Sequence, residues 1–214
     1  MAPARAIVFD FNGTLSDDEP VLVGIYQSLF AEHGRPMTPE QYFAELAGNT
    51  EEAIIGSWLG VDGAELEALV AERIARYCAI ADGSTIPAER RAAVRAAASR
   101  GPVGLVSGAY RTEIRPVLEG AAIAELFATV VTAEDVAAGK PAPDGYLLAL
   151  EHLGDGLRPQ DVVALEDTEA GVASAKAAGL HCVGVLGTLP AERLRQADEI
   201  VARLDVELIE RLLG

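Results

Sequence analysis

Residues 6–15 read Ala-Ile-Val-Phe-Asp-Phe-Asn-Gly-Thr-Leu, an apolar run that stops at the carboxylate of Asp10 and a turn around Gly13. The run Ala6–Phe9 is apolar at every position, which is typical of a strand buried on both faces in a parallel sheet. A carboxylate that follows such a strand, with a glycine close behind, is held in a tight turn whose backbone amides suit an oxyanion. Taken alone, an Asp at a strand end is more often a turn or capping residue.

Further apolar runs extend this pattern along the chain. They show no strict polar alternation, as expected of strands covered by helices on both faces: Val103–Val106, Thr129–Thr132, Val162–Leu165 and Cys182–Leu186. Helical segments separate them, including Ala88–Ser99, Ala142–Leu153 and Glu169–Ala178. This alternation predicts an α/β fold with a doubly wound parallel sheet. We expect Glu199–Leu213 to add a short extended stretch and a closing helix.

Residues 20–81 differ from the rest because no strand pattern interrupts them. A first helical stripe stops at Gly34 and contains Leu22, Ile25, Tyr26, Leu29 and Phe30. A second stripe contains Leu66, Leu69, Val70, Ile74 and Tyr77. Both stripes are interpreted as core packing and say nothing of a ligand. We therefore expect an all-helical cap at 20–81, inserted between the two parts of an α/β core at 1–19 and 82–214.

The composition limits the classes of function. The chain has 214 residues, 50% of them hydrophobic, which suits one α/β domain with an insert. Its formal net charge of −16 argues against a general nucleic-acid binder, although a bound cation can still attract a phosphorylated substrate locally. No stretch is long enough to cross a membrane, and Met1 runs into Ile7 too soon for a signal-peptide core. We expect Cys78 and Cys182 to be reduced, buried thiols in a cytoplasmic protein.

Polar residues follow other predicted strands at the ends where open parallel sheets bind ligands. Ser107 and Gly108 offer a hydroxyl and an unhindered amide for phosphate oxygens, although a plain Ser-Gly turn is as common. Lys140 is followed by Pro141 and Pro143, which restrict the backbone and indicate a cation in a fixed position. Most lysines, however, are solvated surface charges. The adjacent acids Glu166 and Asp167 repel each other unless a hard metal joins them. An acidic first turn of a helix is the alternative for that pair.

Together these patterns resemble the haloacid dehalogenase superfamily over essentially the whole chain. The family's first motif, Asp-x-Asp-Gly-Thr-Leu, often continues as x-Asp-Ser-Glu-Pro, and here Asp10–Leu15 continues as Ser16-Asp17-Asp18-Glu19-Pro20. The remaining motifs match in order: Ser107-Gly108, Gly-Lys-Pro-Ala-Pro-Asp at 139–144, and Glu166-Asp167-Thr168 leading to Ala-Ala-Gly at 177–179. The branch that the chain resembles contains β-phosphoglucomutase-like and phosphoglycolate-phosphatase-like proteins, which carry a small helical cap where the insert lies here.

The resemblance implies a role for each motif residue. Asp10 would attack phosphorus and become an aspartyl phosphate, which water then hydrolyses. Mg²⁺ would be held by Asp10, the backbone carbonyl of Asn12, Asp167 and Glu166. The phosphoryl oxygens would be stabilised by Ser107, Lys140 and the backbone amides near Asn12 and Gly108. The cap loop at Gly48, Asn49 and Thr50 would help to choose the leaving group.

Asn12 departs from the family pattern, which has a second Asp at this position as general acid and base. A carboxamide orients a group by hydrogen bonding but does not exchange a proton near neutral pH. General acid–base catalysis is typically worth ~10²–10⁴-fold, so an ordinary alkyl-phosphate phosphatase should lose about that much. The explanations are a good leaving group, a substitute acid among Asp17, Asp18 and Glu19, a weak enzyme, an enzyme that stops at the aspartyl phosphate, or an engineered replacement. Asp17 matches the family's helix-capping Asp.

The leading hypothesis is a Mg²⁺-dependent phosphatase of a small phosphorylated metabolite. One alternative is a phosphate- and metal-binding regulatory protein that has lost turnover through Asn12. A β-phosphoglucomutase-like phosphotransferase is a further alternative, disfavoured by Asn12 and by Leu22 where those mutases carry His. Dehalogenation or phosphonate hydrolysis would use the same nucleophile. We expect a monomer or weak homodimer that binds neither nucleic acid nor membranes.

Overall fold

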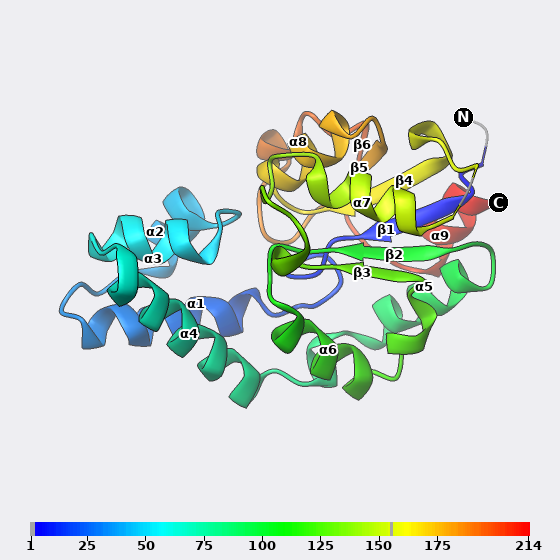
Figure 1. Cartoon of the computed structure of the whole chain (residues 1–214). Helices are drawn as coiled ribbons and strands as arrows, with labels where there is room; N and C mark the ends of the chain where they lie inside the picture. Colours follow the sequence, from blue (N-terminus) through cyan, green and yellow to red (C-terminus); the bar gives the residue numbers. More distant parts are fainter. Residues whose placement is uncertain (1–2, 155) are drawn as a thin grey trace.

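A computed structural model describes residues 3–154 and 156–214 and contains a six-stranded parallel sheet (Figure 1). The strands are β1 (Ala6–Phe9), β2 (Val103–Val106), β3 (Thr129–Val131), β4 (Val162–Glu166), β5 (His181–Val185) and β6 (Glu199–Val201). Their order is β3-β2-β1-β4-β5-β6, and every neighbouring pair is parallel. The predicted doubly wound parallel sheet is therefore confirmed. Such a strand order places the ligand crevice beyond the carboxyl ends of the central strands.

Helices cover both faces of the sheet. One face packs against α5 (Ala88–Ala98), α6 (Arg111–Gly120) and α9 (Val206–Leu213), and the other against α7 (Asp144–His152) and α8 (Glu169–Ala177). Short 3₁₀ segments lie at Gly83–Thr85, Ala124–Leu126, Ala133–Asp135, Pro159–Asp161 and Ala191–Leu194. The predicted extended stretch and closing helix after residue 199 correspond to β6 and α9.

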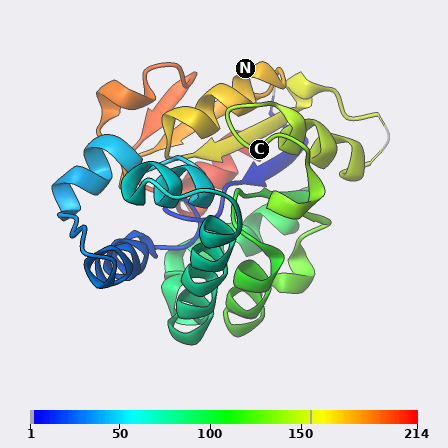
Figure 2. The same cartoon turned by 60° about the vertical axis from the view of Figure 1, so that its left-hand side comes forward.

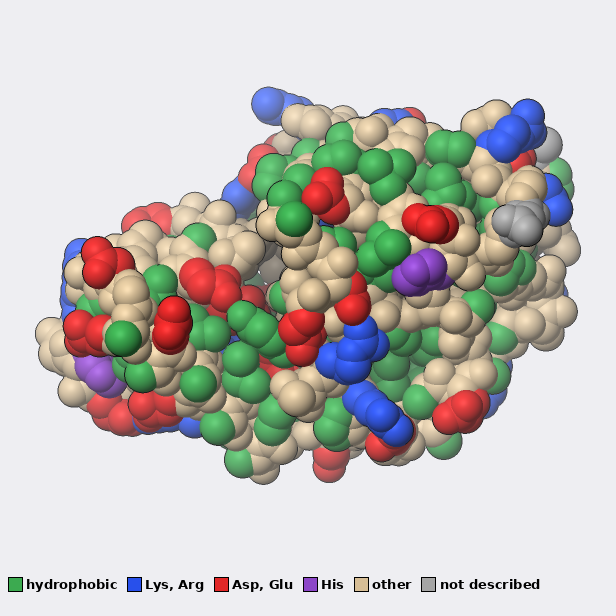
Figure 3. All heavy atoms as spheres, viewed as in Figure 1, with side chains coloured by type: hydrophobic (Ala, Val, Ile, Leu, Met, Phe, Trp, Pro, Cys, Tyr) green, Lys and Arg blue, Asp and Glu red, His purple; other side chains and the backbone are tan. Residues whose placement is uncertain are grey.

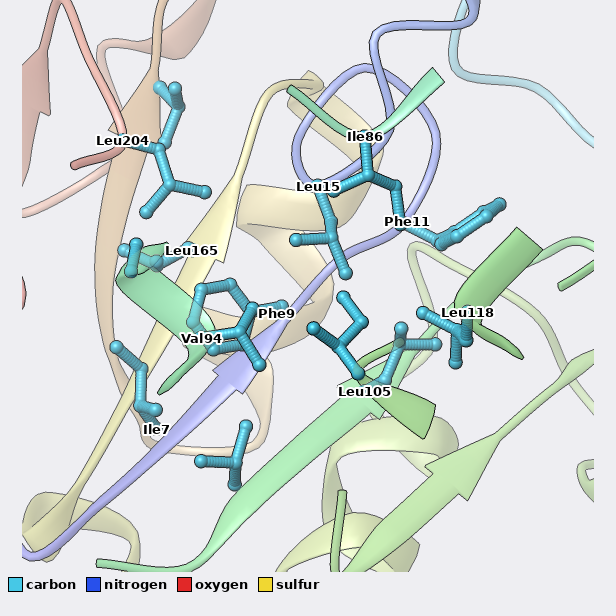
Figure 4. Close-up of a cluster of buried hydrophobic side chains, with 14 of the residues drawn as sticks. Ile7, Phe9, Phe11, Leu15, Ile86, Val94, Leu105, Leu118, Leu165 and Leu204 are labelled. Carbon is cyan, nitrogen blue, oxygen red and sulfur yellow. The ribbon is translucent and has the colours of Figure 1, made fainter. Parts of the chain in front are cut away.

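The alternation of side chains along β1 explains why the strand reads as continuously apolar. Ile7 and Phe9 belong to the core under α5 and α9, and Figure 4 shows them among buried side chains of that core. Ala6 and Val8 point to the opposite face and belong to the core under α7 and α8. Because both faces are buried, no position of this strand tolerates a polar side chain, and the chain becomes polar only at Asp10.

The segment between β1 and α5 is helical. It contains α1 (Glu19–Glu32), α2 (Pro39–Gln41), a π-helical turn (Tyr42–Leu46), α3 (Glu51–Leu59) and α4 (Gly63–Ile80), and we call α1 to α4 the helical lobe. Figures 1 and 2 show this lobe beside the end of the sheet, connected to it by two chain segments. Tyr26, Phe30 and Tyr42 lie in its own hydrophobic core. The all-helical character predicted for this segment is confirmed, while its division from the core at residues 20 and 81 stays a prediction.

The two cysteines differ in their exposure. Cys78 was expected to be buried, but it is exposed on α4, while Cys182 is buried on β5. The expectation was wrong because Cys78 follows Tyr77 and turns away from the buried face of its helix. No helix among the described residues is long and apolar enough to cross a membrane.

Candidate active site

The four sequence motifs meet at one cleft beyond the carboxyl ends of the strands. Asp10 follows β1, Ser107 follows β2 and Asp167 follows β4, while Lys140 comes from the loop between β3 and α7. All four line a cavity of about 260 Å³ together with Gly108. Residues of the helical lobe form its other side, and Figure 3 shows the surface drawn in between the lobe and the α/β part. The expected convergence of the four residues is confirmed.

Lys140 connects two of these motifs through its ammonium group. Its Nζ donates to Oδ1 of Asp10 at 2.6 Å and to the carbonyl of Val106 at 3.1 Å, and it pairs with Oε1 of Glu166 at 2.6 Å. Burial alone would lower the pKa of Lys140, but the carboxylates of Asp10 and Glu166 outweigh burial and raise it. The lysine is therefore a charged, three-point anchor that fixes the side chain of Asp10.

Asp10 is one of three carboxylates that cluster at the cleft. Oxygen atoms of Asp10, Glu166 and Asp167 lie within 4.8 Å of one another, and all three side chains are buried. Burial, followed by the charges of Asp10 and Glu166, raises the pKa of Asp167 well above its ordinary value. Oδ2 of Asp167 has no hydrogen-bond partner among the described residues, whereas Oδ1 accepts from Thr14 at 3.1 Å. A small hard cation with oxygen ligands satisfies both the crowded charges and the unpartnered oxygen, so these residues fit Mg²⁺.

Glu166 already uses both of its oxygens. Oε1 accepts from Tyr146 at 2.6 Å and meets Lys140, and Oε2 accepts from the backbone amide of Asp167 at 3.3 Å. Burial raises the pKa of Glu166, and the charge of Lys140 partly opposes that rise. With its acceptors occupied, Glu166 holds Lys140 and Asp167 in place, and its predicted role as a direct metal ligand stays a prediction.

Two glycines let these carboxylates approach the backbone. A Cβ at Gly13 would collide with Oδ2 of Asp167, and the φ of +76° also favours glycine there. A Cβ at Gly171, in the first turn of α8, would collide with the carboxylate of Glu166. The motif glycine after Asn12 is therefore required by the approach of Asp167 as well as by the turn.

Asn12 is fixed by the acid that begins α1. Its Nδ2 donates to Oδ2 of Asp18 at 2.9 Å, and Asp18 also accepts from the backbone amide of Gly13 at 3.4 Å and from the hydroxyl of Tyr77. The resemblance assigned the helix-capping position to Asp17. That assignment is wrong, because Asp17 is exposed and Asp18 is the buried residue at the start of α1. Oδ1 and the second N–H of Asn12 are left to meet other groups.

The phosphate side of the cleft offers compact polar groups. Ser107 is 5% exposed, and its Oγ accepts from the backbone amide of Ala109 at 3.0 Å. This hydrogen bond fixes the hydroxyl at the carboxyl end of β2. A Cβ at Gly108 would meet nothing within 4 Å, so the space beside its backbone is open, as the sequence predicted. These groups, with Lys140, can accommodate the oxygens of a phosphoryl group.

The loop at Gly48, Asn49 and Thr50 lines the helical-lobe side of the cleft, and its role in choosing the leaving group stays a prediction. Asn49 donates to the carbonyl of Leu46 in the preceding π-helical turn, and Thr50 caps α3 by accepting from the amide of Ala53. Sequence reasoning singled out none of the following lining residues for substrate binding: Glu19, Tyr26, Tyr42, Glu51, Glu52, Arg73 and Tyr110. One signal existed, because Arg73 interrupts the apolar stripe of α4 at helical spacing from Leu69 and Tyr77. A buried cation on an apolar face requires partners, and one of the partners of Arg73, Glu51, lines the cleft.

Comparisons with known proteins agree with this geometry. The family profile of haloacid dehalogenase-like hydrolases matches residues 4–179. The chain is 30% identical over 203 residues to validoxylamine A 7'-phosphate phosphatase of Streptomyces hygroscopicus subsp. limoneus, covering 94% of both chains. It is 28% identical to phosphoglycolate phosphatase of Yersinia pseudotuberculosis, covering 85% of this chain and 80% of that one.

Solved structures show the same fold. A haloacid dehalogenase-like hydrolase from Bacteroides fragilis superimposes with a TM-score of 0.84 at 25% sequence identity, covering 96% of this chain and 99% of that one. The match includes both the sheet and the helical lobe, since it spans nearly the whole of each chain. The resemblance inferred from the four motifs is confirmed.

Proposed function

The chain belongs to the haloacid dehalogenase-like hydrolase family, and from this premise we propose that it is a Mg²⁺-dependent phosphatase of a small phosphorylated metabolite. Membership of this family makes it an enzyme, and the two curated relatives described above are named as phosphatases. The observation that carries the proposal is the placement of Asp10. Its carboxylate lies in the cleft, paired with the charged Lys140, and belongs to a cluster of three buried carboxylates.

Asp10 is proposed as the nucleophile. Lys140 holds Oδ1 at 2.6 Å, so the carboxylate is fixed and the second oxygen, Oδ2, is the one that attacks phosphorus. The bond from phosphorus to the leaving oxygen breaks as the bond from Oδ2 forms, which leaves an aspartyl phosphate and a released alcohol that must gain a proton. Water then attacks the phosphorus of this intermediate, and Asp10 is restored with the release of phosphate.

The charge on the transferring group requires stabilisation from the phosphate side. Lys140 supplies a positive charge, and Ser107 with the amide near Gly108 supplies hydrogen-bond donors. Asp10, Asp167 and the backbone carbonyl of Asn12 are proposed to hold Mg²⁺, while Glu166 orients Lys140 and Asp167. When bound, the cation neutralises charge on the phosphoryl oxygens and lowers the repulsion between substrate and nucleophile.

Proton transfer to the leaving group is the step for which Asn12 is unsuited. Asn12 donates one N–H of Nδ2 to Asp18, and its remaining N–H and Oδ1 can form hydrogen bonds, but a carboxamide does not release a proton near neutral pH. We therefore expect an enzyme that favours leaving groups of low pKa, unless another acid supplies the proton. Of the three acids near in sequence, Asp17 is exposed and Asp18 is occupied, whereas Glu19 lines the cleft.

Release of phosphate from p-nitrophenyl phosphate, with Mg²⁺ and with EDTA, tests the proposal. We expect turnover only with Mg²⁺, and no transfer of the phosphoryl group to an added sugar. Binding of phosphate and Mg²⁺ without turnover on any ester would instead support the regulatory protein. Transfer to a sugar acceptor would support the phosphotransferase. A cytoplasmic location and a monomer or weak homodimer stay predictions.

A further inference from the structure

The helical-lobe side of the cleft carries an excess of negative charge. Three acids, Glu19, Glu51 and Glu52, line it, and Arg73 is the cation that faces them. Arg73 is 1% exposed and pairs with Glu51 at 3.4 Å and with Glu113 of α6. With two carboxylates already around its guanidinium, Arg73 has no charge left for an anionic ligand. A second carboxylate or phosphate on the leaving group would therefore meet repulsion there.

Two buried atoms on this side lack hydrogen bonds. Within the described part of the chain, Oε2 of Glu19 and Nε of Arg73 are buried without a partner, and both residues line the cleft. The other two such side-chain atoms, Oδ2 of Asp167 and Oγ1 of Thr188, both crowd the site of Gly13 near the acidic cluster. An unsatisfied buried polar atom is costly, so each of the lobe-side atoms calls for a ligand group.

The two atoms are complementary in kind. Oε2 of Glu19 is an acceptor and Nε of Arg73 is a donor, and a hydroxyl group both donates and accepts. Tyr26 and Tyr42 add aromatic surface with hydroxyl groups along the same wall. Burial and the neighbouring charge of Asp18 raise the pKa of Glu19 to about 7, and a carboxyl in either protonation state can pair with a hydroxyl. A carboxylate ligand would satisfy Nε of Arg73 but would oppose an ionised Glu19.

We propose that the substrate is the phosphate monoester of a hydroxyl-rich alcohol without a second anionic group, such as a sugar, polyol or cyclitol. A hydroxyl near the ester binds between Glu19 and Arg73. These two residues thus determine specificity and are distinct from the groups around Asp10 that act on the phosphoryl group. The proposal rests on the proposed phosphatase activity and adds the class of leaving group to it.

A matched pair of esters tests the proposal on the unaltered enzyme. Glycerol phosphate and phosphoglycerate differ in a hydroxymethyl against a carboxylate, and a hexitol phosphate and phosphogluconate differ in the same way. With Mg²⁺ present, we expect kcat/KM to favour the neutral member of each pair by about tenfold or more. Equal or inverted preference, in an enzyme that hydrolyses p-nitrophenyl phosphate, would overturn the proposal. Failure on p-nitrophenyl phosphate as well would overturn the proposed function itself.

Two substitutions test whether Glu19 and Arg73 cause this substrate preference. Glu19→Gln and Arg73→Lys should each lower kcat/KM for glycerol phosphate and the hexitol phosphate by about 10–100-fold relative to p-nitrophenyl phosphate, which has no hydroxyl, and mainly through KM. A loss mainly in kcat that only Glu19→Gln shows would instead assign Glu19 to proton transfer and would overturn its role in specificity. Glu32→Gln, at the far end of the same helix, is the matched control and should change none of them. An equal loss on all substrates would show that Glu19 acts elsewhere. Arg73→Lys retains the buried charge, and if it does not fold, Glu19→Gln and the ester pairs still decide.

Discussion

Asn12 lies where the family pattern has an acid, in a turn that is otherwise intact. The carboxamide takes the place of a carboxylic acid and is held by Asp18, which Tyr77 and the amide of Gly13 also contact. This network gives a structural reason for an amide instead of an acid at position 12, a question that the sequence alone left open. Two acids side by side at 12 and 18 would share a buried space and repel each other, whereas an amide donates to the acid.

Asn12→Asp is expected to restore proton transfer to poor leaving groups. The new carboxyl would lie beside the buried Asp18, and this neighbour would raise its pKa into the range of a general acid. We expect kcat/KM for alkyl phosphates to rise by about 10²–10⁴-fold while p-nitrophenyl phosphate changes little. A plot of rate against leaving-group pKa measures this, with Gln160→Glu, an exposed amide-to-acid change outside the cleft, as control. If no ester gains, another acid already supplies the proton, and Glu19 is the one that lines the cleft.

At the scale of elements, a buried charge cluster joins the helical lobe to the α/β part. Arg73 on α4 pairs with Glu51 on α3 and with Glu113 on α6, and its guanidinium lies 5.6 Å from the ring centre of Tyr26. Since α6 packs on the sheet, this cluster fixes how the lobe sits over the cleft. Two carboxylates share one arginine, so burial together with the uneven charge raises the pKa of Glu51 to about 7.

The pH dependence of stability tests this cluster. Because the folded pKa of Glu51 is raised above its ordinary value of 4.5, its favourable contribution is complete below that value and is lost as pH rises through about 7. Between about pH 5 and pH 8, the free energy of unfolding should fall further in the unaltered protein than in Glu51→Gln, by on the order of 1–3 kcal/mol. Chemical denaturation at several pH values measures it. Glu52→Gln, exposed on the same turn, should follow the unaltered protein, and identical slopes for all three would contradict the account.

At the scale of the whole molecule, the parallel sheet brings together residues that are far apart in sequence. Motifs at 10, 107, 140 and 167 end on one edge because neighbouring strands run in the same direction. The sequence predicted this convergence since each motif follows an apolar run. It named Glu19 only as one of three possible substitute acids and did not name Arg73, because the side of a helix that faces a cleft depends on how the helical lobe docks. The expectations that Cys78 is buried and that Asp17 caps α1 were wrong for the same reason, because the outcome depends on how the helices pack.

Binding of Mg²⁺ should stabilise the folded molecule as a whole. Three buried carboxylates repel each other without a cation, so saturating Mg²⁺ at about 0.15 M salt is expected to raise the unfolding temperature. At a concentration of 100 times Kd the gain is about 2.7 kcal/mol. Asp167→Ala removes a ligand and one repulsive charge, so the variant should lose the Mg²⁺-dependent rise. A rise that persists unchanged in this variant would show that the cation binds elsewhere on this acidic protein.

The most direct test of the central claim is mass spectrometry of protein quenched during turnover of p-nitrophenyl phosphate. With Mg²⁺ we predict one phosphoryl group on the peptide that contains Asp10, since an amide at position 12 is expected to slow the steps that need proton transfer and water activation. The adduct and the turnover should both disappear with EDTA and in Asp10→Asn, which keeps the shape of the side chain but removes the nucleophilic carboxylate. Full turnover by Asp10→Asn, or a phosphoryl group found on a peptide that lacks Asp10, would contradict the account.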